Sequence, residues 1–342
     1  MYEYELQNAA DKLIREMFAV KRGEVVVITG DTCSNREVAD AMAASAYSAG
    51  AKPVVIWTAT PEGVGKSADP MLPVEVLSNA LSAADVWIEI NRQWLLYSTP
   101  FERAMANNGK LRYMCLVEMN ADLMIRTIGK VDCTALRAFM LRVTELTKNA
   151  KRMRITTPAG TDVDFDIDPG HYCQCDCGDA SVPGMHMLTG QINVVPRFGS
   201  INGTIVYDGC ITPPFGRVPL QPVRMEVRKS RIEKISGGQE AAEFDAYLRS
   251  FDDEGMLKLA HVAYGFNPGA KLTGNIVEDE RVWGATEWGI GYVSRLDAPP
   301  HGQDAKSHCD GICLASSVWL DERRIMENGV VCDDELNALY AR

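Results

Sequence analysis

The sequence predicts two domains: an N-terminal α/β domain with a mostly parallel sheet in three layers over residues 1–150, and a β-rich α+β domain over residues 151–342. Three observations lead to this prediction. The length of 342 residues is about twice that of a common domain. Strand-like and helix-like patterns alternate in the first part, which is typical of a parallel sheet covered by helices. In the second part, short β-rich segments are separated by Gly and Pro.

The first domain opens with an expected helix over residues 1–18, where Leu6, Leu13 and Met17 recur at helical spacing. This stretch contains acidic residues and no small-residue cleavage site, so we expect a helix of the mature chain, not a signal peptide. Short apolar strands, as in a sheet buried on both faces, then alternate with helices. The expected strands are 23–30, 52–57, 84–90 and 111–117, and the expected helices are 36–50, 71–84, 101–109 and 134–150.

The first strand-to-helix turn lacks the G-x-G-x-x-G spacing that brings a pyrophosphate close to the backbone. We therefore expect the first domain to act as a scaffold. In the second domain, Gly and Pro bound the β-rich segments. The expected strands there are 191–196, 203–209, a pair within 222–238, and 308–320, and the expected helices are 241–251 and 333–342.

Charge and cysteine content exclude several classes of protein. The chain carries 35 Lys and Arg against 46 Asp and Glu, for a net charge of -11. An acidic chain repels phosphate backbones and anionic lipid, so we expect no nucleic-acid and no membrane partner. No run reaches the roughly 18 apolar residues that span a bilayer. Ten cysteines without an export signal are typical of a reducing compartment, so we expect a cytoplasmic protein.

A first group of metal-type side chains is His171, Cys173, Cys175 and Cys177. Alternate residues of a strand face the same side, so the four could converge. Structural zinc sites, however, use a C-x2-C pair and a second ligand pair, which are both missing. Free thiols are the favoured interpretation of this cluster.

A second group is formed by His308 and Asp310, which share one face if residues 308–320 form a strand. An imidazole and a carboxylate presented together are two of the three ligands of a 2-His-1-carboxylate iron site. His261, in an apolar segment, is a candidate third ligand. The alternatives are a hydrogen-bonded His308–Asp310 pair and a core histidine at 261.

Glu287 lies in an apolar, glycine-rich segment. A carboxylate in such a setting is costly unless it is paired, bound to metal, or used as an acid or base. Glu287 is therefore a candidate catalytic group. An ion pair with a nearby arginine such as Arg295 is the alternative.

The α/β first half followed by TGQINVVP, AHVAYGFNPGA, GATEWGIGY and HCDG, in that order, resembles the aminopeptidase T superfamily over nearly the whole chain. In aminopeptidases of that superfamily, the resemblance implies two metals, held in part by two glutamates and a histidine. At those positions this chain has Gln191, His261 and Glu287, and it keeps His308 and Asp310. Loss of the two carboxylates favours one metal over two.

This pattern is similar to that of the 2,5-dihydroxypyridine 5,6-dioxygenase branch. The resemblance implies that His261, His308 and Asp310 hold Fe(2+). It also implies a ring-cleaving extradiol-type dioxygenase with a small aromatic, dihydroxypyridine-like substrate and O2, and a homo-oligomer. The dioxygenases of this branch have a histidine base in the first domain. This chain has none there and offers Tyr97, Ser98 and Thr99 instead, so Glu287 could serve as the base.

Two other functions stay open. The same residues could hold Zn(2+) or another divalent metal in a hydrolase of the aminopeptidase T type, with Glu287 as general base. The chain could also be a relative that kept the fold and lost the original site. In either enzyme, we expect the substrate in a cleft between the domains.

Overall fold

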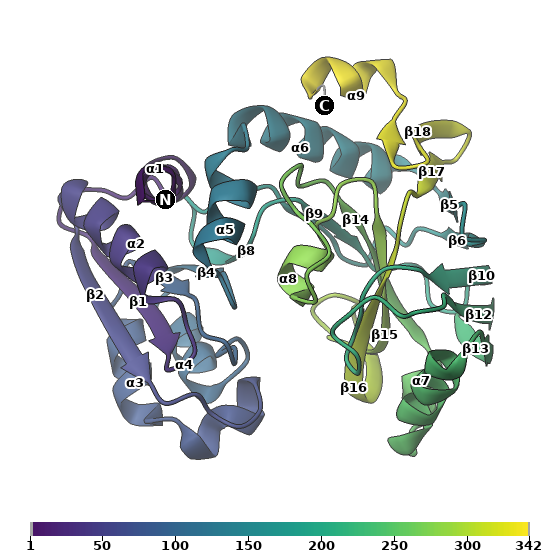
Figure 1. The fold of residues 1–342 in the computed structure, drawn as a ribbon, viewed down its shortest axis with the longest axis horizontal. Coiled ribbons are helices and arrows are strands. Elements are labelled where there is room, and N and C mark those ends of the chain that lie inside the picture. Colours follow the sequence, from purple (N-terminus) through teal and green to yellow (C-terminus); the bar gives the residue numbers. More distant parts are fainter. Residues whose placement is uncertain (1–2, 341–342) are drawn as a thin grey trace. The chain divides into compact units, whose positions relative to one another are not determined.

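The computed structural model describes residues 3–340 (Figure 1). It divides into two compact units, of which the first runs to Cys133 and adds Gly178–Thr189, and the second comprises Thr134–Cys177 and continues from Gly190. The predicted fold class, α/β followed by a β-rich α+β part, is confirmed. The units are interleaved along the chain, whereas the sequence suggested one boundary near residue 150. The reason is that a strand after Gly178 returns to the first sheet, while the helix after Cys133 packs in the second unit.

The first unit contains a parallel five-stranded sheet in the order β2-β1-β3-β4-β8. Its strands are β1 (Val25–Asp31), β2 (Lys52–Thr58), β3 (Val86–Glu89), β4 (Arg112–Cys115) and β8 (Gly184–Met187). Its helical segments are α1 (Glu3–Asp11), a π-helical segment (Lys12–Met17), α2 (Arg36–Ser48), a 3₁₀ segment (Gly65–Met71), α3 (Val74–Ser82), α4 (Thr99–Asn107), α5 (Ala121–Met124) and a second π-helical segment (Ile125–Gly129).

The strand order explains the three layers. The chain starts at β1 and adds β2 on one side of it. It then adds β3 and β4, one after the other, on the other side of β1. Right-handed crossovers then place α2 on one face and α3 and α4 on the other. In agreement, α1 packs with α2, and α3 packs with α4. The expected helix over 71–84 begins at Val74, because the 3₁₀ segment and Pro73 precede it.

The second unit contains two antiparallel sheets. The larger has the order β13-β12-β10-β6-β5-β17-β18-β19, and the smaller has the order β11-β16-β15-β14-β9-β7. The larger sheet consists of β5 (Arg152–Thr156), β6 (Asp162–Asp166), β10 (Asn202–Tyr207), β12 (Val223–Arg228), β13 (Arg231–Ser236), β17 (Ser317–Leu320), β18 (Arg323–Glu327) and β19 (Val330–Val331). The smaller consists of β7 (Cys173–Asp176), β9 (Gln191–Val194), β11 (Ile211–Thr212), β14 (Leu259–Gly265), β15 (Thr286–Val293) and β16 (Gln303–Cys313).

The helical segments of the second unit are α6 (Cys133–Asn149), α7 (Gln239–Ser250), a 3₁₀ segment (Glu254–Leu257), α8 (Ile276–Asp279) and α9 (Asp334–Leu339). The helix α6 covers one face of the six-stranded sheet, since the hydroxyls of Thr147 and Tyr264 lie 3.0 Å apart. Successive side chains of a strand point to opposite faces of the sheet, so Ala263, the residue before Tyr264, points to the face opposite α6. That opposite face, free of α6, carries the site described below.

Two expectations, for the last strand and for the last helix, need correction. Residues 308–320 form the end of β16 and all of β17, which belong to different sheets. The strand breaks because Ala315 adopts a left-handed backbone, with φ of 48°. The last helix is shorter than 333–342, and residues 341–342 lie outside the described residues, as do residues 1–2 of the expected first helix. Among residues 3–340, the helices lack the combination of length and apolar character that a membrane crossing requires.

Candidate metal centre

Three neighbouring strands, β14, β15 and β16, place the candidate site residues on one face of the six-stranded sheet. The antiparallel register pairs Asp310 with Gly289, and Glu287 with Ala263. Paired residues share a face, and so do residues two apart along a strand. His261 and His308 therefore join Glu287 and Asp310 on the face opposite to α6.

The side chains meet closely. His308 Nε2 lies 2.9 Å from Asp310 Oδ1, and His261 Nε2 lies 3.7 Å from the same oxygen. One possible ligand atom from each of these three residues lies within 4.8 Å of the other two. The two imidazole rings stack with centroids 5.0 Å apart. The structure thus brings together the three residues that the sequence suggested as ligands, and their donor atoms are close enough to share one metal ion.

The geometry also bears on the two alternatives, an isolated His308–Asp310 pair and an arginine partner for Glu287. His308 and Asp310 do form a hydrogen-bonded pair. A second imidazole beside that pair is what distinguishes the arrangement from an isolated pair. Oε2 of Glu287 lies within hydrogen-bond distance of Nε2 of His261, at 3.0 Å, and the ion pairs of the described residues do not join Glu287 to Arg295. Glu287 therefore belongs to the same cluster as the three candidate ligands.

Glycine in β15 makes room for His261. A Cβ atom built on Gly289 would lie 2.6 Å from Cε1 and 2.7 Å from Nδ1 of the His261 ring. Any side chain at this position would push the ring away from Asp310. The glycine-rich segment of β15 thus allows the imidazole to lie flat against the sheet.

Burial and charge shift the pKa values of these groups. Burial raises the pKa of Glu287 well above its usual range, and the negative charges of Asp310 and Glu280 add to this effect. Burial lowers the pKa of His261 to about 4, and the neighbouring His308 acts in the same direction. Glu287 is thus set up to hold a proton, whereas His261 is set up as a neutral imidazole, the form that binds metals.

His308 and Asp310 stabilise each other's charged forms. Burial acts to lower the pKa of His308, but the charge of Asp310 and its hydrogen bond outweigh burial and raise it. Burial acts to raise the pKa of Asp310, and His308 outweighs this and lowers it. His308 Nδ1 lies 2.9 Å from the carbonyl oxygen of Tyr292. Because a carbonyl only accepts, Nδ1 carries a proton, and Nε2 is the nitrogen that would face a metal.

Sequence reasoning missed a second group of charges beside the site. Arg281 is fully buried and contacts Asp176 at 3.3 Å and Glu280 at 3.0 Å. Burial raises the pKa of Glu280 to about 7, although Arg281 opposes this rise. No local pattern marks this group, because Asp176 comes from β7 and the other two follow α8.

Other residues named from the sequence lie in different settings. Gln191 is buried in β9, opposite Asp176 in the register. His171 precedes β7, and Cys173 and Cys175 lie in it. Among the described residues, the metal-type grouping is that of His261, His308 and Asp310, so the His171–Cys177 cluster does not assemble as a further site. All ten cysteines are free thiols.

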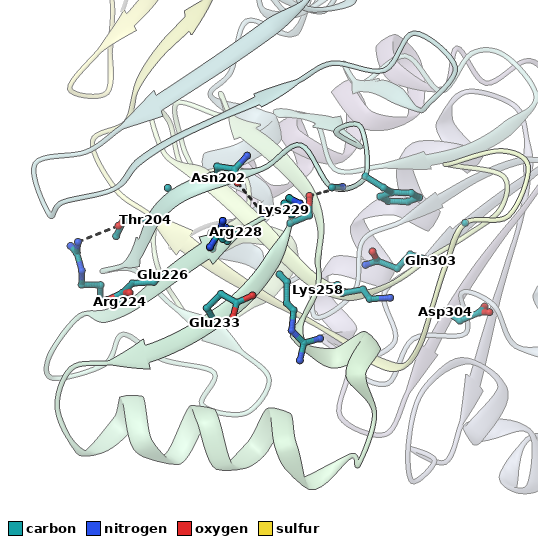
Figure 2. Close-up of a pocket in the computed structure, with 17 residues that line it drawn as sticks. Asn202, Thr204, Arg224, Glu226, Arg228, Lys229, Glu233, Lys258, Gln303 and Asp304 are labelled. Carbon is teal, nitrogen blue, oxygen red and sulfur yellow. Dashed lines mark hydrogen bonds between the residues drawn. The ribbon is translucent and has the colours of Figure 1, made fainter.

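Two cavities of the second unit lie away from the candidate ligands. An open groove of about 1490 Å³ runs along β10, β12 and β13 and is lined by cations that include Arg228, Lys229 and Lys258 (Figure 2). A smaller pocket of about 610 Å³ is lined by residues that include Cys173 and Cys175. Neither cavity contains the candidate ligands, whose grouping rests on the proximity of their donor atoms.

Comparison with known proteins matches most of this chain to one family. Residues 9–333 match the family model described as 2,5-dihydroxypyridine 5,6-dioxygenase. A 2,5-dihydroxypyridine 5,6-dioxygenase from Pseudomonas putida is 28% identical over 198 residues, which is 57% of this chain and 54% of that relative. The match thus spans about half the length of that protein.

Solved structures extend the likeness to the whole fold. The structure of 2,5-dihydroxypyridine dioxygenase from Pseudomonas putida KT2440 has a TM-score of 0.81 and 18% identity, and the match covers 98% of this chain and 99% of that one. Wild-type AmpT from Thermus thermophilus has a TM-score of 0.69 and 14% identity, with 97% and 100% covered. At these identities the structures support the fold alone.

Proposed function

The chain belongs to the 2,5-dihydroxypyridine 5,6-dioxygenase family, and from this premise we propose that it is a mononuclear non-haem Fe(II) dioxygenase that opens a dihydroxypyridine-like ring. The observation that carries the proposal is the grouping of His261, His308 and Asp310 with donor atoms within 4.8 Å. Two imidazoles and one carboxylate are the donor set of Fe(II) oxygenases that leave coordination positions open.

The surroundings fit a divalent cation. Four carboxylates gather here, those of Asp176, Glu280, Glu287 and Asp310, and Arg281 forms ion pairs with Asp176 and Glu280. Buried negative charge is costly unless it is compensated, and a bound metal ion would compensate it. In addition, Oε1 of Glu287 is buried without a hydrogen-bond partner among the described residues.

When bound, Fe(II) supplies open positions for a substrate oxygen and for O2 together with the redox chemistry. The chain itself orients the donors. Tyr292 fixes the ring of His308, because its carbonyl oxygen accepts a hydrogen bond from Nδ1 and leaves Nε2 for the metal. Contacts of this kind hold ligand rings in the orientation that binding requires.

Glu287 is our candidate for proton transfer. Its carboxyl group is fully buried, and burial raises its pKa. A carboxyl group with a raised pKa is a stronger base than an exposed one once it has lost its own proton, and the positive charge of a bound metal ion would favour that loss. In that state it can accept the proton of a substrate hydroxyl group. This role would replace the histidine that the first half of the chain lacks.

We also propose a cytoplasmic homo-oligomer with iron as the native metal. The ten free thiols agree with a reducing compartment. Size-exclusion chromatography with light scattering would measure the oligomeric state.

Oxygen uptake tests the proposed function. Protein purified without oxygen and loaded with Fe(II) is expected to consume about one O2 for each 2,5-dihydroxypyridine, with loss of the aromatic absorbance, because both oxygen atoms enter the opened ring. Zinc-loaded protein serves as the control, since zinc has no redox chemistry. Cleavage of a chromogenic amino-acid amide by the zinc form, without oxygen uptake by the iron form, would instead support the hydrolase.

A further inference from the structure

Unpartnered polar atoms mark a second part of the site face. Among the described residues, Oδ1 of Asn193, Oε1 of Glu287 and Oγ1 of Thr212 are buried and have no hydrogen-bond partner. Buried polar atoms in native proteins are nearly always paired, so a group of exceptions requires an explanation. A ligand that supplies the missing partners is one.

The register shows that the three atoms belong to one face. Asn193 in β9 pairs with Ala263 in β14, and Ala263 pairs with Glu287 in β15. Thr212 in β11 pairs with Asp310 in β16. Paired residues share a face. The three side chains therefore lie on the same face of the sheet as the candidate ligands. In the strand order, Thr212 follows Asp310 at one end of the group, and Asn193 follows His261 at the other end.

Small residues separate Asn193 from the ligands. The residue between Asn193 and Glu287 is Ala263, and Gly289 lies beside it on the next strand. Adjacent strands are about 4.8 Å apart, so the backbones at Asn193 and Glu287 are roughly 10 Å apart. This interval is about the span of one aromatic ring that carries a polar group on each of two opposite edges.

We propose that Asn193 is a specificity-determining residue that hydrogen-bonds to a polar group of the substrate ring, on the ring edge that faces away from the candidate metal ligands. The inference rests on the proposed dioxygenase function and adds to it the residue of this chain that recognises the second polar group of the ring. The amide of Asn193 can donate or accept, so it suits a hydroxyl group or its tautomeric carbonyl.

The test replaces Asn193 by leucine, which has a similar size and no polar atom. We expect the KM for 2,5-dihydroxypyridine to rise about tenfold, with kcat and iron content within about twofold of the wild type, because a site loses one substrate hydrogen bond. We expect the thermal unfolding midpoint of the substrate-free protein to stay equal or rise, because a buried unpaired polar atom is removed. A purely structural asparagine would lower it.

Controls make the result specific. The same change at the exposed Asn79 should leave the KM unchanged. Asn193→Ala should also raise the KM, because it removes the hydrogen bond without adding bulk. A rise with leucine alone would mean that leucine obstructs the site, and it would overturn the assignment of Asn193. Inhibition by 2-hydroxypyridine and by 3-hydroxypyridine, which each lack one hydroxyl group, should distinguish the two edges. The Asn193 variant and the wild type should bind one of these compounds equally, namely the one without the group that Asn193 recognises.

The outcomes separate this inference from the proposed function. If the wild type consumes no oxygen with 2,5-dihydroxypyridine, the proposed function is wrong and the inference is wrong with it. If the wild type is active and both Asn193 variants keep its KM, the function stands and the assignment of Asn193 is overturned.

Discussion

Replacement of Asp310 by alanine is expected to abolish stoichiometric metal binding and to reduce oxygen uptake to the level of metal-free protein. Asp310 is the one carboxylate of the candidate donor set, and its Oδ1 lies near both imidazoles, at 2.9 Å and 3.7 Å. Loss of groups that merely support a ligand costs about 10- to 100-fold in metal affinity. Loss of a ligand should therefore cost at least about 100-fold.

The fold should survive this change. Asp310 is a buried carboxylate beside Glu287 and Glu280, and each negative charge disfavours the others. Removal of one charge relieves that repulsion, and His308, which loses its charged partner, can become neutral, so the circular dichroism spectrum should stay the same. Asp304→Ala is a matched control, because Asp304 is an exposed carboxylate on the same strand. Full metal content in the Asp310 variant would show that the metal, if any, is held elsewhere.

The second large effect is expected from Gly289→Ala, which alters no donor atom. The added methyl group would lie 2.6 Å from the His261 ring, well inside contact distance. The ring can swing away, so the strand should keep its pairing, but the swing removes Nε2 from Asp310 and His308. We expect the affinity for Fe(II) or Zn(II) to fall by about 10-fold or more.

For Gly289→Ala, metal titration measures the loss of metal affinity, and circular dichroism measures whether the fold is kept. Gly109→Ala serves as the control, because a Cβ atom at Gly109 meets nothing within 4 Å. If Gly289→Ala binds metal as tightly as the wild type, His261 is not a ligand in its present position.

Local sequence patterns were sufficient to predict many helices and strands of the first unit and part of the candidate site. The apolar run of β1 is a local feature, and it predicted a strand that the structure contains. The alternation in H-x-D placed His308 and Asp310 on one face. His261 lies far away in sequence, and the resemblance to known enzymes was needed to group it with that pair.

Long-range contacts explain what could not be predicted. Asp176 and Arg281 meet because β7 pairs with β9 and the turn after α8 lies near that strand. Asn193 shows no distinctive pattern within QINVVP, and its position follows only from the register with Ala263. The break between β16 and β17 at Ala315 could not be predicted either, since alanine seldom adopts a left-handed backbone.

The most direct test of the account is a crystal structure of the iron-loaded protein, measured at wavelengths on both sides of the iron absorption edge. The account predicts one anomalous peak per chain, within about 2.3 Å of Nε2 of His261, Nε2 of His308 and a carboxylate oxygen of Asp310. Two peaks bridged by carboxylates, or a single peak on other side chains, would contradict it.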